Sequence, residues 1–121
     1  MADELSISLS FALSKGSTEI AERIRDLLID VAGTHVTHLR QEIDTSETEI
    51  VLGDAGVGGW FFAINRDDTN FIEIRHAKSA PDLIRMLAGE FCLFRISPDA
   101  NEPQAIADTA ACELEYWLIE L

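Results

Sequence analysis

Apolar residues occupy every second position from Leu5 to Leu13, and serine or alanine fills the positions between them. A period of two residues is typical of a β-strand with one buried and one exposed face. Lys15, Gly16 and Ser17 follow, and this composition predicts a turn. We therefore expect a strand over 5–13 that ends in a short connection.

The next segment, Thr18–Val31, fits two structures. Apolar residues at 20, 24, 27, 28 and 31 follow the spacing of one helical face, with acidic residues at 22, 26 and 30 opposite them. The second half of the segment also alternates, with apolar residues at 27, 29 and 31. The local pattern favours a helix and leaves a strand as the alternative.

Short alternating or apolar segments recur along the rest of the chain, separated by turn-forming residues. The expected strands are 34–43, 48–52, 60–64, 71–75, 91–96 and 113–121, while 82–87 fits a strand or a helical turn and 105–111 a connector. Strands at this spacing are typical of antiparallel sandwiches and barrels. We predict a mainly β fold, an antiparallel, jelly-roll-like β-sandwich of about eight short strands. It would form one domain over 1–121, with room for one short helix.

The charge balance narrows the range of partners. The chain has 22 Asp and Glu against 9 Lys and Arg, a net charge of −13, while 47% of its residues are hydrophobic. Such an apolar content predicts a packed globular domain, and the acidic excess disfavours nucleic acid as a partner. Because the N-terminus is acidic and no apolar run approaches about 20 residues, we expect no secretory signal and no membrane partner.

The histidines and cysteines do not predict a metal site or a disulfide. His35 and His38 would point to opposite faces of a strand, and His76 is far along the chain. Cys92 and Cys112 lie in apolar, strand-like stretches, which is typical of buried free thiols.

Three further patterns have simpler explanations than catalysis or ligand binding. The glycine-rich stretch 53–59 lacks the Lys-Ser/Thr and the following helix of a phosphate loop. The oxygen-bearing residues Asp67, Asp68 and Asn70 lack the EF-hand spacing. Glu113 and Glu115 share a strand face, but close pairs occur by chance among so many acidic residues, and no serine lies in a nucleophile elbow. We therefore predict no catalytic residue, no cofactor, no metal and no enzymatic activity.

The remaining feature is an excess of apolar surface. The segments 60–62, 91–94 and 117–119 carry large apolar residues on both faces, whereas a two-layer sandwich buries one face of each sheet. Either Thr18–Val31 or the loops cover the second faces, or they form an interface between subunits of a homo-oligomer. The candidate interface residues are Trp60, Phe61, Phe62, Phe91, Phe94, Trp117 and Ile119.

Short motifs that together carry a family resemblance are spread over nearly the whole chain. The motifs are Leu-Ser-Ile-Ser-Leu-Ser at 5–10, Leu-Ser-Lys-Gly at 13–16, Val-Ala-Gly-Thr-His at 31–35, Ile-Asp-Thr-Ser-Glu at 43–47, Leu-Gly-Asp at 52–54, Thr-Asn-Phe-Ile-Glu-Ile at 69–74, Leu-Ala-Gly-Glu at 87–90, Leu-Phe-Arg at 93–95, Ala-Asp-Thr-Ala-Ala at 107–111 and Leu-Glu-Tyr at 114–116. Together these motifs resemble those of small virion structural proteins of tailed bacteriophages. The resemblance offers no catalytic residues.

The resemblance implies a multicopy β-sandwich subunit of a virion, made in the host bacterial cytoplasm. Capsid decoration or cement is the first expectation, and a neck, tail or fibre-attachment component is the second. Its partners would be copies of itself and the major capsid protein or neck and tail proteins. Related chains look strand-like at Thr18–Val31, which moves that prediction toward a strand. A further alternative is a carbohydrate-binding module that uses Trp60 or Trp117 as a stacking platform.

Overall fold

The structure, a computed structural model, describes residues 3–121 and divides the chain into two compact units. The first unit ends at Ala32, and the second is Gly33–Leu121. We predicted a single sandwich over 1–121. Instead, the sandwich occupies the second unit alone, and the first unit is a separate β-hairpin.

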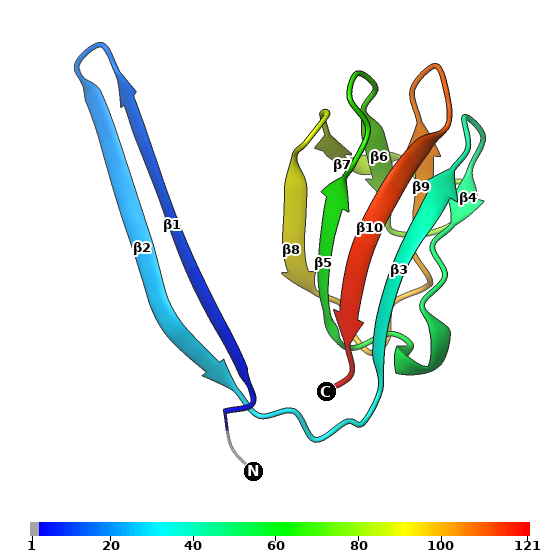
Figure 1. Ribbon diagram of the computed structural model, residues 1–121, viewed down its shortest axis with the longest axis horizontal. Coiled ribbons are helices and arrows are strands. Elements are labelled where there is room, and N and C mark those ends of the chain that lie inside the picture. Colours follow the sequence, from blue (N-terminus) through cyan, green and yellow to red (C-terminus); the bar gives the residue numbers. More distant parts are fainter. Residues whose placement is uncertain (1–2) are drawn as a thin grey trace. The chain divides into compact units, whose positions relative to one another are not determined.

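The hairpin consists of β1 (Leu5–Lys15) and β2 (Thr18–Ile29), which pair antiparallel along their full length (Figure 1). The turn between them uses Gly16 with a φ of 59°, a conformation that favours glycine. The helix that the local pattern favoured at Thr18–Val31 is therefore wrong, and the strand alternative is confirmed.

A β-bulge explains why this strand resembles a helix in sequence. Ile7 pairs with Leu27 and Leu9 pairs with Ile24, so Arg25 and Asp26 together occupy the space opposite Ser8. Asp26 adopts a φ of 52° there, and its amide donates to the Ser8 hydroxyl oxygen at 3.1 Å. The extra residue makes apolar positions recur at intervals of four and three, which is the spacing of a helical face.

The second unit is an eight-stranded sandwich (Figure 1). Its strands are β3 (Val36–Ile43), β4 (Thr48–Glu49), β5 (Trp60–Asn65), β6 (Ile72–Arg75), β7 (Asp82–Met86), β8 (Phe91–Arg95), β9 (Gln104–Ala107) and β10 (Cys112–Ile119). A single 3₁₀ turn, η1 (Gly53–Ala55), precedes β5.

Two four-stranded antiparallel sheets form the layers of the sandwich. The first sheet has the order β3-β10-β5-β8 and the second has the order β4-β9-β6-β7. Counted in chain order, the eight strands therefore run 1-8-3-6 and 2-7-4-5, which is the strand order of a jelly roll. The predicted mainly β, jelly-roll-like sandwich is confirmed.

For two strands of the second sheet, the prediction from the sequence was either undecided or different from the structure. Asp82–Met86 is the strand β7, which resolves the choice between strand and turn. Gln104–Ala107 was predicted as part of a connector, and this is wrong because it forms β9 between β4 and β6. Its alanines give no propensity signal for a strand, but Ala105 and Ala107 are buried in the core of the sandwich.

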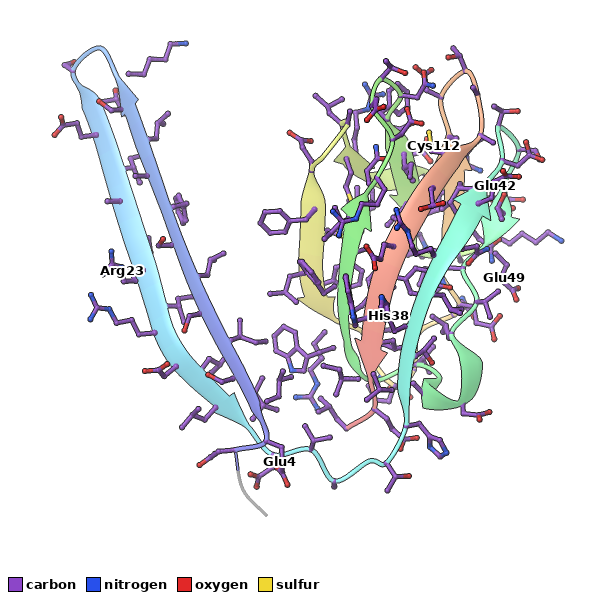
Figure 2. All side chains as sticks on the ribbon, in the orientation of Figure 1. Glu4, Arg23, His38, Glu42, Glu49 and Cys112 are labelled. Atoms are coloured by element: carbon purple, nitrogen blue, oxygen red, sulfur yellow. The ribbon has the colours of Figure 1, made fainter. Side chains whose placement is uncertain are left out.

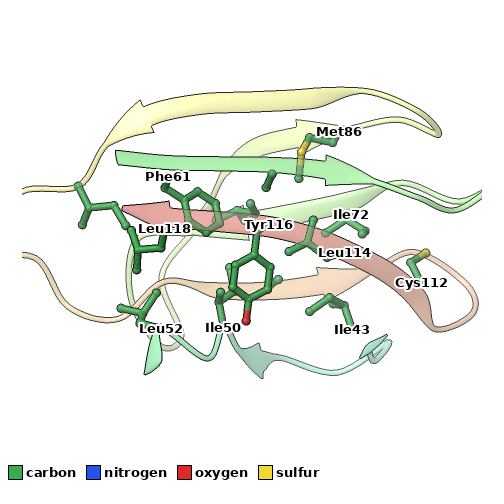
Figure 3. Close-up of a cluster of buried hydrophobic side chains, with 14 of the residues drawn as sticks. Ile43, Ile50, Leu52, Phe61, Ile72, Met86, Cys112, Leu114, Tyr116 and Leu118 are labelled. Carbon is green, nitrogen blue, oxygen red and sulfur yellow. The ribbon is translucent and has the colours of Figure 1, made fainter. Parts of the chain in front are cut away.

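The core lies between the two sheets and is built by alternation along each strand (Figure 3). On β10, Leu114, Tyr116 and Leu118 point inward and are fully buried, while Trp117 and Ile119 between and after them point outward. The largest of the other fully buried side chains are Phe61, Ile43, Ile50, Ile72 and Met86.

Candidate interaction surface

The outward face of the first sheet collects most of the residues that the sequence suggested for an interface. Trp60 and Phe62 on β5, Trp117 and Ile119 on β10, and Phe91 on β8 alternate with the inward-facing core residues of their strands. We call these five side chains the aromatic face. Each is half-buried except Phe91, which is 56% exposed.

Two of the suggested residues lie in the core or pack against it. Phe61 is fully buried and contacts the Tyr116 ring, with centroids 5.6 Å apart. Phe94 packs against the same cluster and lies 5.3 Å from Phe61, again between ring centroids. The assignment of Phe61 to an interface is therefore corrected, because a strand that is apolar on both faces still sends alternate side chains in opposite directions. Phe94 is only partly buried and stays a candidate.

A continuous row of rings crosses all four strands of this sheet, formed by Trp117, Phe62 and Phe91 of the aromatic face together with His38. His38 on β3 stacks on Trp117 with 4.4 Å between ring centroids and 12° between planes. Trp117 contacts Phe62 at 5.4 Å, and Phe62 contacts Phe91 at 5.9 Å, both between ring centroids. The pairing register produces this row, because Trp117 lies opposite both His38 and Phe62 in the sheet. Such offset pairs stabilise one another beyond the area they bury.

A charged network borders the row. Glu115 on β10 accepts hydrogen bonds from Arg66 at 2.8 and 2.7 Å and contacts His38 Nε2 at 2.8 Å. The hydrogen bonds from His38 and then Arg66 lower the pKa of the Glu115 carboxyl. Its neighbour Glu113 pairs with Arg40 on β3. Both carboxylates are thus held by cations, and the pair does not form the free acid and base of a hydrolase.

One polar atom on this face has no partner. The indole Nε1 of Trp60 is shielded from solvent, and it is the one such side-chain nitrogen or oxygen in residues 3–121 that lacks a hydrogen bond. Buried donors are normally satisfied, so Trp60 could donate to an acceptor supplied by a bound molecule.

The hairpin presents a second apolar surface that the sequence pattern did not reveal as exposed. The pairing of β1 with β2 places all their large aliphatic and aromatic side chains except Leu28 on one side, interrupted by Glu22 opposite Phe11. The most exposed side chains on this side are between 37% and 54% exposed to solvent. We call this side the hairpin's apolar face, and it comprises Leu5, Ile7, Leu9, Phe11, Leu13, Ile20, Ile24, Leu27 and Ile29. Leu28 lies opposite Ser6 on the other side and is 50% exposed.

A third apolar region is a groove of about 410 Å³ beside the edge strands β7 and β8. Ile74, Ile84, Phe94 and Ile96 line its floor, and Leu83 on its rim is 74% exposed. Sequence analysis missed this groove, since its lining comes from separate strands that only the topology brings together.

The other candidates have structural roles. Asp67 accepts amide hydrogen bonds from Asn70 and Thr69, which lower the pKa of its carboxyl, and it closes the turn after β5. His35 pairs with Glu120 at 3.2 Å. Residues 53–59 contain η1 and lead into β5. Within residues 3–121 no group of three or more His, Cys, Asp or Glu could hold a metal ion.

Both cysteines are free. Burial raises the pKa of the Cys92 thiol to about 11, and it also raises the pKa of Cys112. These thiols are therefore poor nucleophiles near neutral pH.

Comparison with known proteins gives no relative: the chain matches no protein-family profile, no curated protein and no solved structure. In the part of the chain that the structure describes, no helix is long and apolar enough to cross a membrane.

Proposed function

We propose that this chain is a multicopy structural subunit of a tailed-bacteriophage virion, one that decorates or cements the capsid by packing against other proteins. The observation that carries the proposal is the hairpin, because a two-stranded ribbon with an exposed apolar face is at best marginally stable alone. Such a ribbon fits a chain that completes its structure on assembly.

The energy available from that face is large for a small protein. Burying a fully exposed Leu, Ile or Phe contributes about 1.5–3 kcal/mol. The six most exposed side chains of the hairpin's apolar face are about half exposed. Covering them therefore releases on the order of 5 kcal/mol, comparable with the whole stability of a small domain. The aromatic face adds a second surface of the same kind.

The fold is compatible with this role without proving it. Jelly rolls occur in viral capsid proteins and also in lectins, and a fold alone does not determine function. The phage resemblance of the sequence motifs selects the first of these two uses. Within the virion, a neck, tail or fibre-attachment component is the alternative location, and the genes beside this one discriminate between them.

The test is incorporation into particles. Trp117→Arg places a charge in the centre of the aromatic face without touching the core, so the variant should fold and fail to join particles. The matched control is Leu87→Arg, which makes the same type of change on an exposed residue just after β7, outside the three apolar regions. Absence of the wild-type chain from purified virions would refute the proposal, and normal incorporation of Trp117→Arg would remove the aromatic face from it.

A carbohydrate-binding module is the second candidate. The unpartnered Trp60 Nε1 beside a row of stacked rings favours it, because aromatic rings stack on sugars and a donor can bind a hydroxyl. Screening the chain on a glycan array tests this candidate. Binding that is lost in Trp60→Ala would support it, and no binding by the wild-type chain would exclude it.

A further inference from the structure

The two edges of the hairpin differ in a way that bears on assembly. From Leu5 to Ser14, β1 contains no charged residue, no glycine and no proline. In contrast, β2 carries Glu19, Glu22, Arg23 and Arg25 and is broken by the bulge at Asp26. Charges and bulges are the features that keep an exposed edge strand from pairing with another chain.

The edge of β1 lacks every one of these protections. In residues 3–121 the hairpin sheet contains only two strands, so one side of β1 pairs with β2 and the other side has no strand partner. An unprotected strand of eleven residues is a template for strand addition. The protected edge of β2 acts as an internal comparison within the same hairpin.

The chemistry of β1 fits a second copy of itself in antiparallel orientation. The pairing that uses the whole strand sets Leu5 opposite Lys15 of the copy and places Ser10 on the two-fold axis. Every pair in that register then joins residues of the same side of the ribbon, so the apolar faces of the two hairpins continue into one four-stranded sheet.

Charge also favours the antiparallel arrangement. The only charged residue of β1 is Lys15, at the tip of the hairpin, while Asp3, Glu4 and Asp30 lie at its base. An antiparallel copy places Lys15 of each chain beside the acidic base of the other. A parallel copy would instead place like charges side by side.

We propose that the free edge of β1 pairs antiparallel with β1 of a second copy, with Ser10 at the two-fold axis. The product is a continuous β2-β1-β1-β2 sheet. Three or more strands with a shared apolar face are what a sheet needs for stability. The pairing stands independently of whether the particle is a virion.

A cysteine at position 10 tests the register directly. Directly opposite residues have Cβ atoms about 4.5–5.5 Å apart, so two copies of Ser10→Cys lie near disulfide reach. The matched control is Ala21→Cys, which faces the same side of the ribbon from β2. Under mild oxidation Ser10→Cys should form a covalent dimer at least tenfold faster than Ala21→Cys. The wild-type chain should form none, because its own thiols are raised in pKa and partly or fully buried.

A second pair of variants tests the same edge without crosslinking. Ser10→Lys brings two like charges together at the axis and should weaken association at least tenfold in sedimentation, whereas Ala21→Lys should leave it unchanged. A wild-type chain that stays monomeric at about 100 μM, or equal crosslinking at positions 10 and 21, would overturn the proposal. An unchanged circular dichroism spectrum confirms that each variant retains its fold.

The outcome is separable from that of the proposed function. A chain that dimerises through Ser10 but is absent from virions keeps the pairing and refutes the virion role. A chain that is present in virions but crosslinks equally through cysteines at positions 10 and 21 keeps the virion role and refutes the pairing.

Discussion

Replacing Tyr116 by phenylalanine should destabilise the sandwich while leaving its outer surfaces intact. The Tyr116 ring is fully buried on β10 (Figure 3). Its hydroxyl donates to the Val51 carbonyl oxygen at 2.6 Å. The same hydroxyl lies 2.9 Å from Gln41 Oε1, which also accepts from the Val51 amide at 3.1 Å. This bond therefore ties β10 to β3 and to the segment after β4.

The magnitude follows from what the substitution removes. Phenylalanine fills the same space, so no cavity opens, and the cost is that of leaving the Val51 carbonyl without its donor. A fully buried acceptor left unpaired costs about 1–3 kcal/mol. This bond is part-buried, so its cost lies in the lower part of that range. For a unit of 60–100 residues each kcal/mol lowers Tm by about 4–8 °C. Taking about 1.5 kcal/mol, we expect Tm to fall by about 6–12 °C.

Calorimetry of the full chain measures this shift, and a double-mutant cycle with Gln41→Leu assigns it. Because Tyr116 and Gln41 share the Val51 backbone as a partner, their effects should be non-additive by at least about 0.5 kcal/mol. A Tm change below about 2 °C for Tyr116→Phe, or additive effects, would show that the bond contributes little.

Alkaline titration gives an independent measurement. Desolvation is the largest cause of the raised pKa of Tyr116, which is about 12. Since the folded pKa exceeds the unfolded value of 10.0, the neutral hydroxyl contributes stability that is present below pH 10 and is lost as the pH rises toward 12. The Tyr116→Phe variant has no hydroxyl to ionise, so it should not show this part of the loss of stability at alkaline pH.

Three further predictions concern the same unit. Phe61→Ala should cost about 3–5 kcal/mol in chemical denaturation, because the ring is fully buried between Phe94 and Tyr116; a cost below about 1 kcal/mol would mean that the core collapses around the gap. Gly59→Ala should cost at least about 2 kcal/mol, because a Cβ there would overlap the Ile119 carbonyl oxygen; a Tm equal to wild type would show that this strand end can move. Glu115→Gln should lower Tm at pH 7, and the Tm difference from wild type should shrink below pH 4.5. The pKa of Glu115 is lowered in the folded state, so its carboxylate contributes stability above the ordinary pKa of 4.5, and this stability is lost as the pH falls through the folded pKa. A Tm difference that does not change with pH would refute the ionic origin.

The sandwich was predictable because most of its strands carry their own signal. Each of β3, β5, β6, β8 and β10 is a short apolar or alternating segment bounded by turn residues, and each appears within a few residues of its predicted range. What the pattern could not determine was which side of a doubly apolar strand faces inward. Phe61 and Phe62 are equivalent in sequence, and only the position of β5 inside the first sheet sends Phe61 to the core.

The errors have two physical sources. The bulge at Asp26 inserts one residue into β2 and converts a period of two into apparent helical spacing, so pattern analysis favoured a helix. In β9, Ala105 and Ala107 have a weak strand propensity, but β9 pairs with β4 and β6 and both alanines are buried in the core, so tertiary packing overrides the local propensity. Alternation in β1 correctly indicated an apolar face but contained no information about whether anything covers it.

The distribution of charge argues that the two apolar surfaces serve different partners. Residues 1–32 carry six acidic and three basic residues, whereas residues 33–121 carry sixteen and six, so the sandwich holds −10 of the −13. Bodies of that charge repel one another at low salt, and association through them alone is disfavoured. In the paired segment of the hairpin, residues 5–29, three acidic and three basic residues cancel, so this segment can join two copies. That leaves the aromatic face for a protein of different charge. Ser10→Lys should therefore abolish self-association but keep particle binding measurable, while Trp117→Arg should do the opposite. If both variants lose both properties together, the two surfaces form one interface and this division of roles is wrong.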